Sequence, residues 1–252
     1  MKIINPETNH IPQLRSLWKE AFGDDDGFLD SFFSTAFSTQ RSRCVTENGR
    51  VVAMLYWFDC EYDGKRIAYI YAVATAVSHR GRGICKTLMD DTHSHLRSLG
   101  YAGALLVPGS ESLFGFYGKM NYKTCCYGRR FSRQGREKAV VLTKIGREEY
   151  AILRRRYLPE NSVIQEKENL SFLETQAEFY KGDDFVMSAY AENGHLTCIE
   201  LLGNTEAASG IVYALDCTEG DFFTPGNELP LGMYLPFDNS VSYPSYFGLA
   251  FN

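Results

Sequence analysis

The sequence lacks the features of several protein classes. Its 252 residues contain no apolar run of the roughly 18 residues that span a membrane, and its first six residues lack an apolar signal core. Its 26 lysines and arginines are outnumbered by 31 acidic residues, so the global positive field of a nucleic-acid-binding protein is missing. Its seven scattered cysteines do not form a secreted disulfide framework. We therefore expect a soluble cytoplasmic protein that binds neither nucleic acid nor membrane.

Several signatures of catalytic and metal sites are also absent. There is no Gly-x-Ser-x-Gly elbow, no His-Glu-x-x-His and no zinc-binding spacing. His93 and His95 are two positions apart on an expected helix, so they lie on different faces and do not ligate one metal together. Cys125 and Cys126 are neighbours in an expected strand and point to opposite sides. We expect no bound metal.

What is present is typical of a globular protein, with 44% hydrophobic and 14% aromatic residues. The length allows one large domain or two smaller ones. Asn48-Gly49 and Asp63-Gly64 each separate two apolar, strand-like runs, and such pairs supply the positive φ values of type I′ turns. Three consecutive antiparallel strands are therefore predicted across residues 43–73.

Two helices are predicted before these strands. A short strand at Ile3-Ile4 is followed by helical apolar spacing over residues 14–22, which ends at Gly23. A second helix over residues 28–37 carries phenylalanines that we expect to pack in the core. The acidic loop Asp24–Asp26 is interpreted as a solvated cap of that helix, in preference to a site that attracts a cationic acceptor.

Helices and strands alternate after the three strands. The pattern predicts a glycine-rich bend at residues 80–83, an amphipathic helix over 84–99, a buried strand over 104–107, a short helix over 113–120 and a strand over 122–127. This order predicts an α+β fold with a mixed, mainly antiparallel central sheet flanked by helices and one local parallel pair.

The second half of the chain is predicted to form a smaller α+β domain, with domains over residues 1–135 and 136–252. We expect a basic connector over 129–138, a strand over 139–145, and a helix over 148–158 whose three arginines, residues 154–156, form a solvated face. Asn193-Gly194 predicts another hairpin, residues 201–204 a strand-to-helix passage, and residues 243–252 a strand. Both halves contain a Glu-Asn-Gly turn followed by strand and helix, which raises the hypothesis of two related halves.

The segment over residues 73–86 carries the clearest chemical pattern. A strand runs through a turn containing Gly81 and Gly83 directly into a helix, so the unpaired N–H groups of the first helical turn are available to an anion such as a pyrophosphate. Arg80 and Arg82 add positive charge. A P-loop requires a glycine directly before Lys86-Thr87, and a Rossmann motif requires a third glycine, so both are excluded.

These residues resemble the GNAT N-acetyltransferase superfamily. Arg80-Gly81-Arg82-Gly83-Ile84 is similar to its pyrophosphate loop, Arg/Gln-x-x-Gly-x-Gly/Ala, and residues 110–122, ending in Phe-Tyr-Gly-Lys-Met-Asn-Tyr, are similar to its second motif. The resemblance covers about residues 1–130. The sequence departs from the family pattern at three positions: Cys85 replaces Gly or Ala, Ser110 replaces a common Asn, and Asn121 replaces Gly.

The resemblance implies an acetyl-CoA co-substrate and a direct transfer of the acetyl group to a primary amine, on a small molecule or a peptide. By motif position, the residues expected to bind the cofactor are Val73, Ala74, Thr75, Arg80, Gly81, Arg82, Gly83, Ile84, Cys85 and Ser110. Tyr117 matches the general acid that protonates the CoA thiolate, and the alternative is a tyrosine packed in the core. The general base is open between Glu61, Glu111 and the terminal carboxylate of Asn252.

The resemblance also bears on the second half, which is interpreted as a GNAT-like half without the glycine-rich loop. We expect it to wall the acceptor cleft or to mediate a homodimer. Two alternatives to the enzyme stay open: a non-catalytic acyl-CoA-binding sensor or interaction module, and a scaffold for protein contacts.

Overall fold

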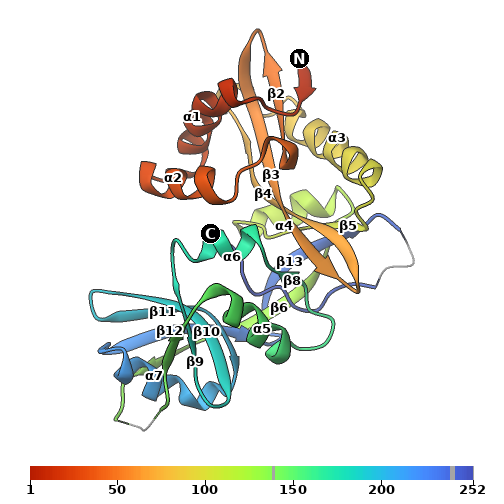
Figure 1. The fold of residues 1–252 in the computed structure, drawn as a ribbon. Coiled ribbons are helices and arrows are strands. Elements are labelled where there is room, and N and C mark those ends of the chain that lie inside the picture. The colour runs from red at the N-terminus through yellow and green to blue at the C-terminus, as the bar shows by residue number, and fades with distance from the viewer. Residues whose placement is uncertain (138–139, 239–241, 252) are drawn as a thin grey trace. The chain divides into compact units, whose positions relative to one another are not determined.

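The computed structural model describes residues 1–137, 140–238 and 242–251, and the chain forms two compact units (Figure 1). Unit 1 comprises Met1–Lys123 and Met233–Ser242, and unit 2 comprises Thr124–Gly232 and Tyr243–Asn252. The chain thus enters unit 2 before residue 135 and returns to unit 1 near its end. Compact units are defined by contacts and not by independent folding, so the domain boundary between residues 135 and 136 stays a prediction.

Unit 1 is a mixed sheet with the strand order β1-β2-β3-β4-β5-β13. All neighbouring strands pair antiparallel except β4 and β5, which pair parallel. The predicted α+β fold with a mainly antiparallel sheet is confirmed. The strands are β1 (Lys2–Ile4), β2 (Ser42–Glu47), β3 (Arg50–Tyr62), β4 (Lys65–Thr75), β5 (Gly103–Leu106) and β13 (Leu229–Pro236), and the helices are η1 (Thr8–His10), α1 (Ile11–Phe22), α2 (Asp26–Thr35), η2 (Thr39–Arg41), η3 (Val77–His79), α3 (Ile84–Ser98) and α4 (Glu111–Gly118).

Strand β3 places its side chains alternately on the two faces of this sheet. Leu55 and Trp57 belong to a buried cluster with residues of α3 and α4, whereas the ring of Tyr56 lies 5.5 Å from that of Trp18 in α1 and 5.1 Å from that of Phe32 in α2. Helices therefore cover both faces, with α1 and α2 on one and α3 on the other (Figure 1). The predicted burial of Phe32 in the core is confirmed.

The local turns follow the sequence closely. Asn48 and Gly49 have φ values of 50° and 76°, and Asp63 and Gly64 have values of 52° and 66°, so both predicted hairpins are confirmed. Gly23 ends α1 with a φ of 81°.

The acidic loop before α2 is a capping loop, as predicted. Asp25 accepts a hydrogen bond from the N–H of Phe28 at 2.8 Å, and Asp24 accepts one from Nε1 of Trp18 at 2.7 Å. Asp26 forms an ion pair with Lys19 at 2.6 Å. All three carboxylates therefore have partners within the two N-terminal helices.

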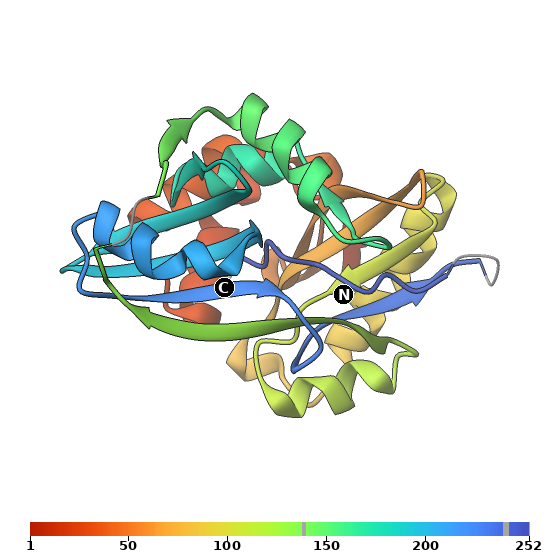
Figure 2. The ribbon, with the colours of Figure 1, turned by 90° about the horizontal axis from the view of Figure 1, so that it is seen from below.

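Unit 2 contains a mixed run of strands, in the order β6-β12-β11-β10-β9-β7. Its parallel pair, β11 and β12, is joined through α7, as β4 and β5 are joined through α3 (Figure 2). This shared crossover supports the hypothesis of two related halves. The strands are β6 (Lys123–Gln134), β7 (Thr143–Ile145), β8 (Ile164–Gln165), β9 (Glu178–Lys181), β10 (Phe185–Glu192), β11 (His195–Gly203) and β12 (Glu219–Pro225), and the helices are α5 (Arg147–Tyr157), α6 (Glu168–Leu173), η4 (Thr205–Ala207) and α7 (Ala208–Ala214).

Three predictions for the second half are wrong in part. Residues 129–134 are no connector, because β6 continues through them and pairs with β12. Arg154 is not solvated: it is 2% exposed and pairs with the buried carboxylate of Glu200. The described residues of the predicted strand 243–252 form no strand and make one bridge, Ser162 to Tyr246.

The strand predicted over residues 139–145 is found at Thr143–Ile145, and Ala139 lies outside the described residues. Among the described residues, no helix is long and apolar enough to cross a membrane.

Candidate functional site

Strands β4 and β5 of unit 1 separate where β4 approaches the glycine-containing turn. Their paired residues end at Ile70 and Leu106, yet β4 continues to Thr75. The last part of β4 therefore has β3 on one side and no β5 residue paired with it on the other. A strand edge of this kind leaves backbone N–H and C=O groups available to an extended ligand.

A β-bulge separates the two parts of β4. Tyr71 pairs with Tyr56 and Ala74 pairs with Met54, so two residues of β4 lie opposite one residue of β3. Within the bulge, Ala72 has a φ of 49°, a left-handed conformation that costs an alanine roughly 1 kcal/mol. A strained bulge of this kind is common beside functional sites, because it re-aims the backbone groups that follow it.

The hydrogen-bond pattern between β3 and β4 beyond the bulge determines which backbone groups of β4 point away from β3, on the side where β5 no longer pairs with β4. The N–H of Ala76 donates to the C=O of Val52 at 2.9 Å. Because hydrogen-bonded and non-hydrogen-bonded pairs alternate in an antiparallel ladder, Ala74 faces β3, and the backbone groups of Val73 and Thr75 face away from it. Val73, Ala74 and Thr75 are all predicted to bind the cofactor, and two of them, Val73 and Thr75, thus have backbone groups that face away from β3.

The turn after β4 has the conformation that its two glycines permit. Gly81 and Gly83 both have a φ of 75°, and a Cβ atom at either position meets nothing within 4 Å. Glycine is therefore needed here for its backbone conformation and not for lack of space. Gly83 is the N-cap of α3 and offers no side chain to the first N–H groups of the helix, so these groups are available to an anion.

The two arginines of the turn are held in different ways. Nε of Arg80 donates to the C=O of Thr75 at 3.1 Å. Nη2 of Arg82 lies 3.0 Å from Oε1 of Glu47 at the end of β2. The predicted loop is therefore positively charged, but one of its charges is partly offset by a carboxylate.

Sequence reasoning missed the residues that hold this loop. Nε2 of His79 lies 2.9 Å from Oε2 of Glu47, and Oγ of Ser78 lies 2.8 Å from Nδ1 of the same histidine. Glu20 of α1 accepts from the N–H of Val77 at 2.7 Å. Glu47 stands directly before the Asn48-Gly49 turn, so its place at a hairpin end was predictable. Its approach to residues 79–82 depends on contacts between distant parts of the chain.

The side chain of Cys85 packs away from the loop. It lies half-buried against the core cluster of unit 1, and burial raises the pKa of its thiol to about 11. The cysteine that departs from the family pattern therefore fills space in the core, and its backbone N–H stays in the first turn of α3 beside that of Ile84.

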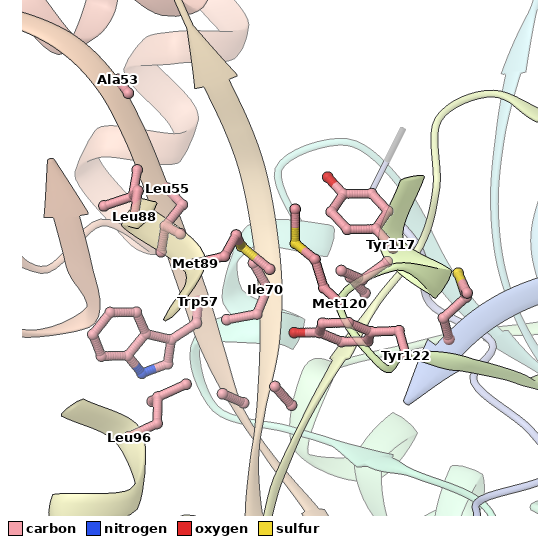
Figure 3. Close-up of a cluster of buried hydrophobic side chains, with 14 of the residues drawn as sticks. Ala53, Leu55, Trp57, Ile70, Leu88, Met89, Leu96, Tyr117, Met120 and Tyr122 are labelled. Atoms are coloured by element: carbon pink, nitrogen blue, oxygen red, sulfur yellow. The ribbon is translucent and has the colours of Figure 1, made fainter. Parts of the chain in front are cut away.

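Tyr117 of α4 has a buried ring, and its hydroxyl has no hydrogen-bond partner in the part of the chain that the structure describes. Its side chain belongs to the same cluster as Ile70 and Leu106, the last paired residues of β4 and β5, and it is 7% exposed. Figure 3 shows it beside Met120 and Tyr122 at one end of this cluster. The Tyr122 hydroxyl is hydrogen-bonded to Nε2 of His93 at 2.8 Å, whereas that of Tyr117 makes no hydrogen bond among the described residues. Burial raises the pKa of Tyr117, so the phenol is protonated at neutral pH.

Two further positions depart from the family pattern, Ser110 and Asn121, and each lies at a place with a distinct local geometry. Ser110 is the exposed N-cap of α4, and its Oγ lies 3.1 Å from that of Ser112. Asn121 has a φ of 67°. Asparagine is among the residues that tolerate this left-handed conformation, which accounts for its presence where the family has glycine.

The structure distinguishes between the candidate general bases by position. Glu61 pairs in register with Arg66, at the end of the β3–β4 hairpin opposite to Thr75. Glu111 is the first residue of α4, next to Ser110. Asn252 lies outside the described residues. Among the described residues, no group of three or more His, Cys, Asp or Glu is placed to hold a metal ion.

Comparison with known proteins connects this geometry to one family. The model of the acetyltransferase (GNAT) domain matches residues 2–125. No curated protein matches the sequence significantly.

Several solved structures share the fold of nearly the whole chain. A GCN5-related N-acetyltransferase from Kribbella flavida has a TM-score of 0.72 and 17% identity, over 94% of this chain and 71% of that one. Eis1 from Mycobacterium abscessus has a TM-score of 0.65 and 12% identity, over 97% and 70%. A putative acetyltransferase from Pyrococcus horikoshii has a TM-score of 0.66 and 13% identity, over 98% and 93%. At these identities the likeness shows the fold alone, and it extends through unit 2.

Proposed function

Because residues 2–125 form a GNAT acetyltransferase domain, a family that uses acetyl-CoA, we propose that this protein moves an acetyl group from acetyl-CoA to a primary amine. The observation that carries the proposal is the continuity of three features in one segment. The free edge of β4, the two left-handed glycines and the uncapped N-terminus of α3 follow one another between Val73 and Cys85.

The residues of this segment fit the parts of acetyl-CoA in chain order. The N–H groups from Gly81 to Cys85, with Arg80 and Arg82 beside them, suit the pyrophosphate. The backbone of Val73 and Thr75 suits the amides of the pantetheine arm. An N–H group of β4 directed at the acetyl carbonyl stabilises the oxyanion that forms during the reaction. Ser110, exposed at the start of α4, is a further polar contact in this proposal.

The reaction is a direct attack in a ternary complex. The amine gives up a proton to a base or a water chain, and its lone pair forms the new C–N bond at the acetyl carbon. The tetrahedral intermediate then breaks its C–S bond, and the electron pair leaves on sulfur. A thiol has a pKa of about 8.5 and a phenol one of about 10. Tyr117, protonated and with no hydrogen-bond partner among the described residues, donates a hydrogen bond to sulfur as the charge develops. Its proton passes to sulfur as the thiol forms, and the phenolate then takes a proton from solvent.

Calorimetry with acetyl-CoA tests the binding half of this proposal. We expect micromolar binding, about −8 kcal/mol, that is lost in the Arg80→Ala, Arg82→Ala double variant. The Arg129→Ala, Arg133→Ala double variant removes two charges from β6 of unit 2 and is the matched control, with unchanged binding. Absence of binding to the folded wild type contradicts the proposal and favours the scaffold.

Kinetics of Tyr117→Phe test the chemical half. With a panel of polyamines, aminoglycosides and lysine peptides, we expect the wild type to acetylate at least one amine. The variant should lower kcat by about 100-fold and leave the KM for acetyl-CoA nearly unchanged, because a general acid contributes in the transition state. Tight acetyl-CoA binding without turnover of any amine supports the alternative, a non-catalytic acyl-CoA sensor.

A further inference from the structure

Unit 2 contains a cavity of about 650 Å³ that the proposed reaction does not use. Two register pairs of its sheet line the cavity: Arg130 of β6 with Phe223 of β12, and Tyr190 of β10 with Thr197 of β11. All of its lining residues belong to unit 2, whereas the proposed acetyl-CoA site lies in unit 1. The volume falls within the range of about 300–1,000 Å³ that is usual for small-molecule sites.

Part of the cavity wall is apolar. Leu173, Phe223 and Phe251 are each at most 8% exposed and line it from α6, β12 and the C-terminal segment. Aliphatic and aromatic surfaces on several sides favour a ligand with an apolar body.

The polar groups of the wall that lack partners are hydrogen-bond donors. Nε2 of Gln176 is buried and has no hydrogen-bond partner in the part of the chain that the structure describes. An unpaired buried amide N–H costs about 1–3 kcal/mol, so an acceptor atom supplied by a ligand is favoured there. The guanidinium of Arg130 is exposed at the cavity and makes no hydrogen bond or close ion pair among the described residues, although its charge also acts on Asp221 in the same wall.

The carboxylate in the same wall is already engaged. Asp221 accepts a hydrogen bond from Oγ of Ser132 and lies 3.1 Å from Nε2 of His195. The hydrogen bond from Ser132, the hydrogen bond and charge of His195 and the charge of Arg130 lower the pKa of Asp221. The donor groups of Gln176 and Arg130 therefore favour an anionic or carbonyl oxygen in this cavity.

We propose that this cavity binds an amphipathic monocarboxylate. Its apolar chain packs against Leu173, Phe223 and Phe251. Its carboxylate accepts a hydrogen bond from Nε2 of Gln176 and is attracted by the positive charge of Arg130. Decanoate is the probe that tests this proposal, with decylammonium as the ligand of equal chain length and opposite charge.

Calorimetry with the full chain gives a direct readout. We expect decanoate to bind with a stoichiometry of one and at least tenfold more tightly than decylammonium. Arg130→Gln should weaken decanoate binding about tenfold and Gln176→Leu about fivefold. Arg156→Gln is the matched control, because the exposed Arg156 guanidinium lies 5.9 Å from the ring centroid of Tyr157 and neither residue lines the cavity. It should leave the affinity unchanged.

The thermal midpoint provides a second readout that does not need the ligand. Gln176→Leu removes an unpaired buried N–H, so the variant should unfold at a higher temperature than the wild type when both are free of ligand. Decanoate should raise the midpoint of the wild type more than that of the variant.

Three results overturn the proposal. Equal affinity of the wild type and Arg130→Gln means non-specific adsorption of an apolar chain. Tighter binding of decylammonium means that Asp221 governs the cavity. No binding of decanoate below its micelle concentration means that the cavity takes no such ligand. Acetyl-CoA binding, measured on the same samples, stays unchanged in every case, so the two proposals fail or succeed separately.

Discussion

Nη2 of Arg82 lies 3.0 Å from Oε1 of Glu47, and Nε2 of His79 lies 2.9 Å from Oε2 of the same carboxylate. Hydrogen bonds from Arg82 and His79 lower the pKa of Glu47, so this group is ionised at neutral pH. A negative charge thus stands beside the loop that we propose for the pyrophosphate. It orders the loop and at the same time opposes the binding of an anion.

Replacing Glu47 with glutamine separates these two effects. The amide oxygen of the new side chain still accepts from Arg82 but carries no charge, so we expect Glu47→Gln to bind acetyl-CoA two- to fivefold more tightly at low ionic strength. A change of this size is expected for one charge at the protein surface. The difference should shrink in high salt. Asp63→Asn, at the tip of the other hairpin, is the control and should bind as the wild type does. Weaker binding by Glu47→Gln contradicts the prediction.

Gly83→Ala tests the backbone of the loop. A Cβ at Gly83 meets nothing within 4 Å, but its φ of 75° costs alanine roughly 1–2 kcal/mol. We expect the Kd for acetyl-CoA to rise at least fivefold in Gly83→Ala and less in Gly83→Asn, because asparagine tolerates the left-handed region. Gly64→Ala is matched in φ, 66°, and in free space. It should lower the thermal midpoint similarly and leave the Kd unchanged. A Kd for Gly83→Ala equal to the wild type removes the loop from the binding site.

Features encoded by neighbouring residues were predictable from the sequence. The hairpins at Asn48-Gly49 and Asp63-Gly64, the left-handed turn before α3 and the end of α1 at Gly23 each depend on the φ values that one or two residues adopt. The spacing of apolar residues predicted α1 and α3 because each helix buries a single face. The residues of the proposed cofactor loop, from Arg80 to Cys85, were recognisable because they are continuous in the sequence, and Ser110 and Tyr117 because they belong to a second short motif.

Features that depend on distant contacts were not predictable. Arg154, Arg155 and Arg156 are consecutive and chemically identical, yet only Arg154 meets a buried carboxylate, and that carboxylate is 46 residues away. The first part of β6 was predicted as a strand, but residues 129–134 were predicted as a connector, because these polar residues pair with β12, about 90 residues later. The separation of β4 from β5 has no local signal either, since it depends on where the pairing with residues 104–106 ends.

Acid should destabilise unit 1 through His93. Burial is the main cause that lowers the pKa of His93 to about 4, and its Nε2 is hydrogen-bonded to Tyr122. The folded state binds the proton more weakly than the unfolded state, whose histidine has a pKa of about 6.5. The stability is therefore fully present above pH 6.5 and is lost as the pH falls toward 4, by about 3 kcal/mol.

The two tryptophans, Trp18 and Trp57, lie in unit 1, so urea unfolding followed by their fluorescence measures this loss. His93→Gln keeps a hydrogen-bonding partner for Tyr122 without titrating, and its stability should fall less between pH 7 and pH 4. Parallel pH profiles of the two proteins would show that His93 is not the cause.

The buried pair of Arg154 and Glu200 gives a last prediction, for unit 2. Nε and Nη2 of the arginine lie 2.6 and 3.0 Å from the two carboxylate oxygens, and Tyr150 and Tyr246 also donate to Glu200 at 3.0 Å each. Glu200→Gln leaves a buried guanidinium without its counter-ion, so it should destabilise unit 2 by about 3–5 kcal/mol. Adding Arg154→Met removes that charge and should recover most of the loss.

The neighbouring pair of Arg155 and Glu166 is the matched control, because its side chains are 45% and 30% exposed. Glu166→Gln should change the stability by less than about 1 kcal/mol. Unit 2 contains neither tryptophan, so far-UV circular dichroism in urea, together with hydrogen exchange of the β10 and β11 amides, follows its unfolding, while tryptophan fluorescence reports unit 1. If Glu200→Gln costs no more than Glu166→Gln, the ion pair is not what holds Arg154 in place, and packing of the aliphatic part of its side chain must account for its burial instead.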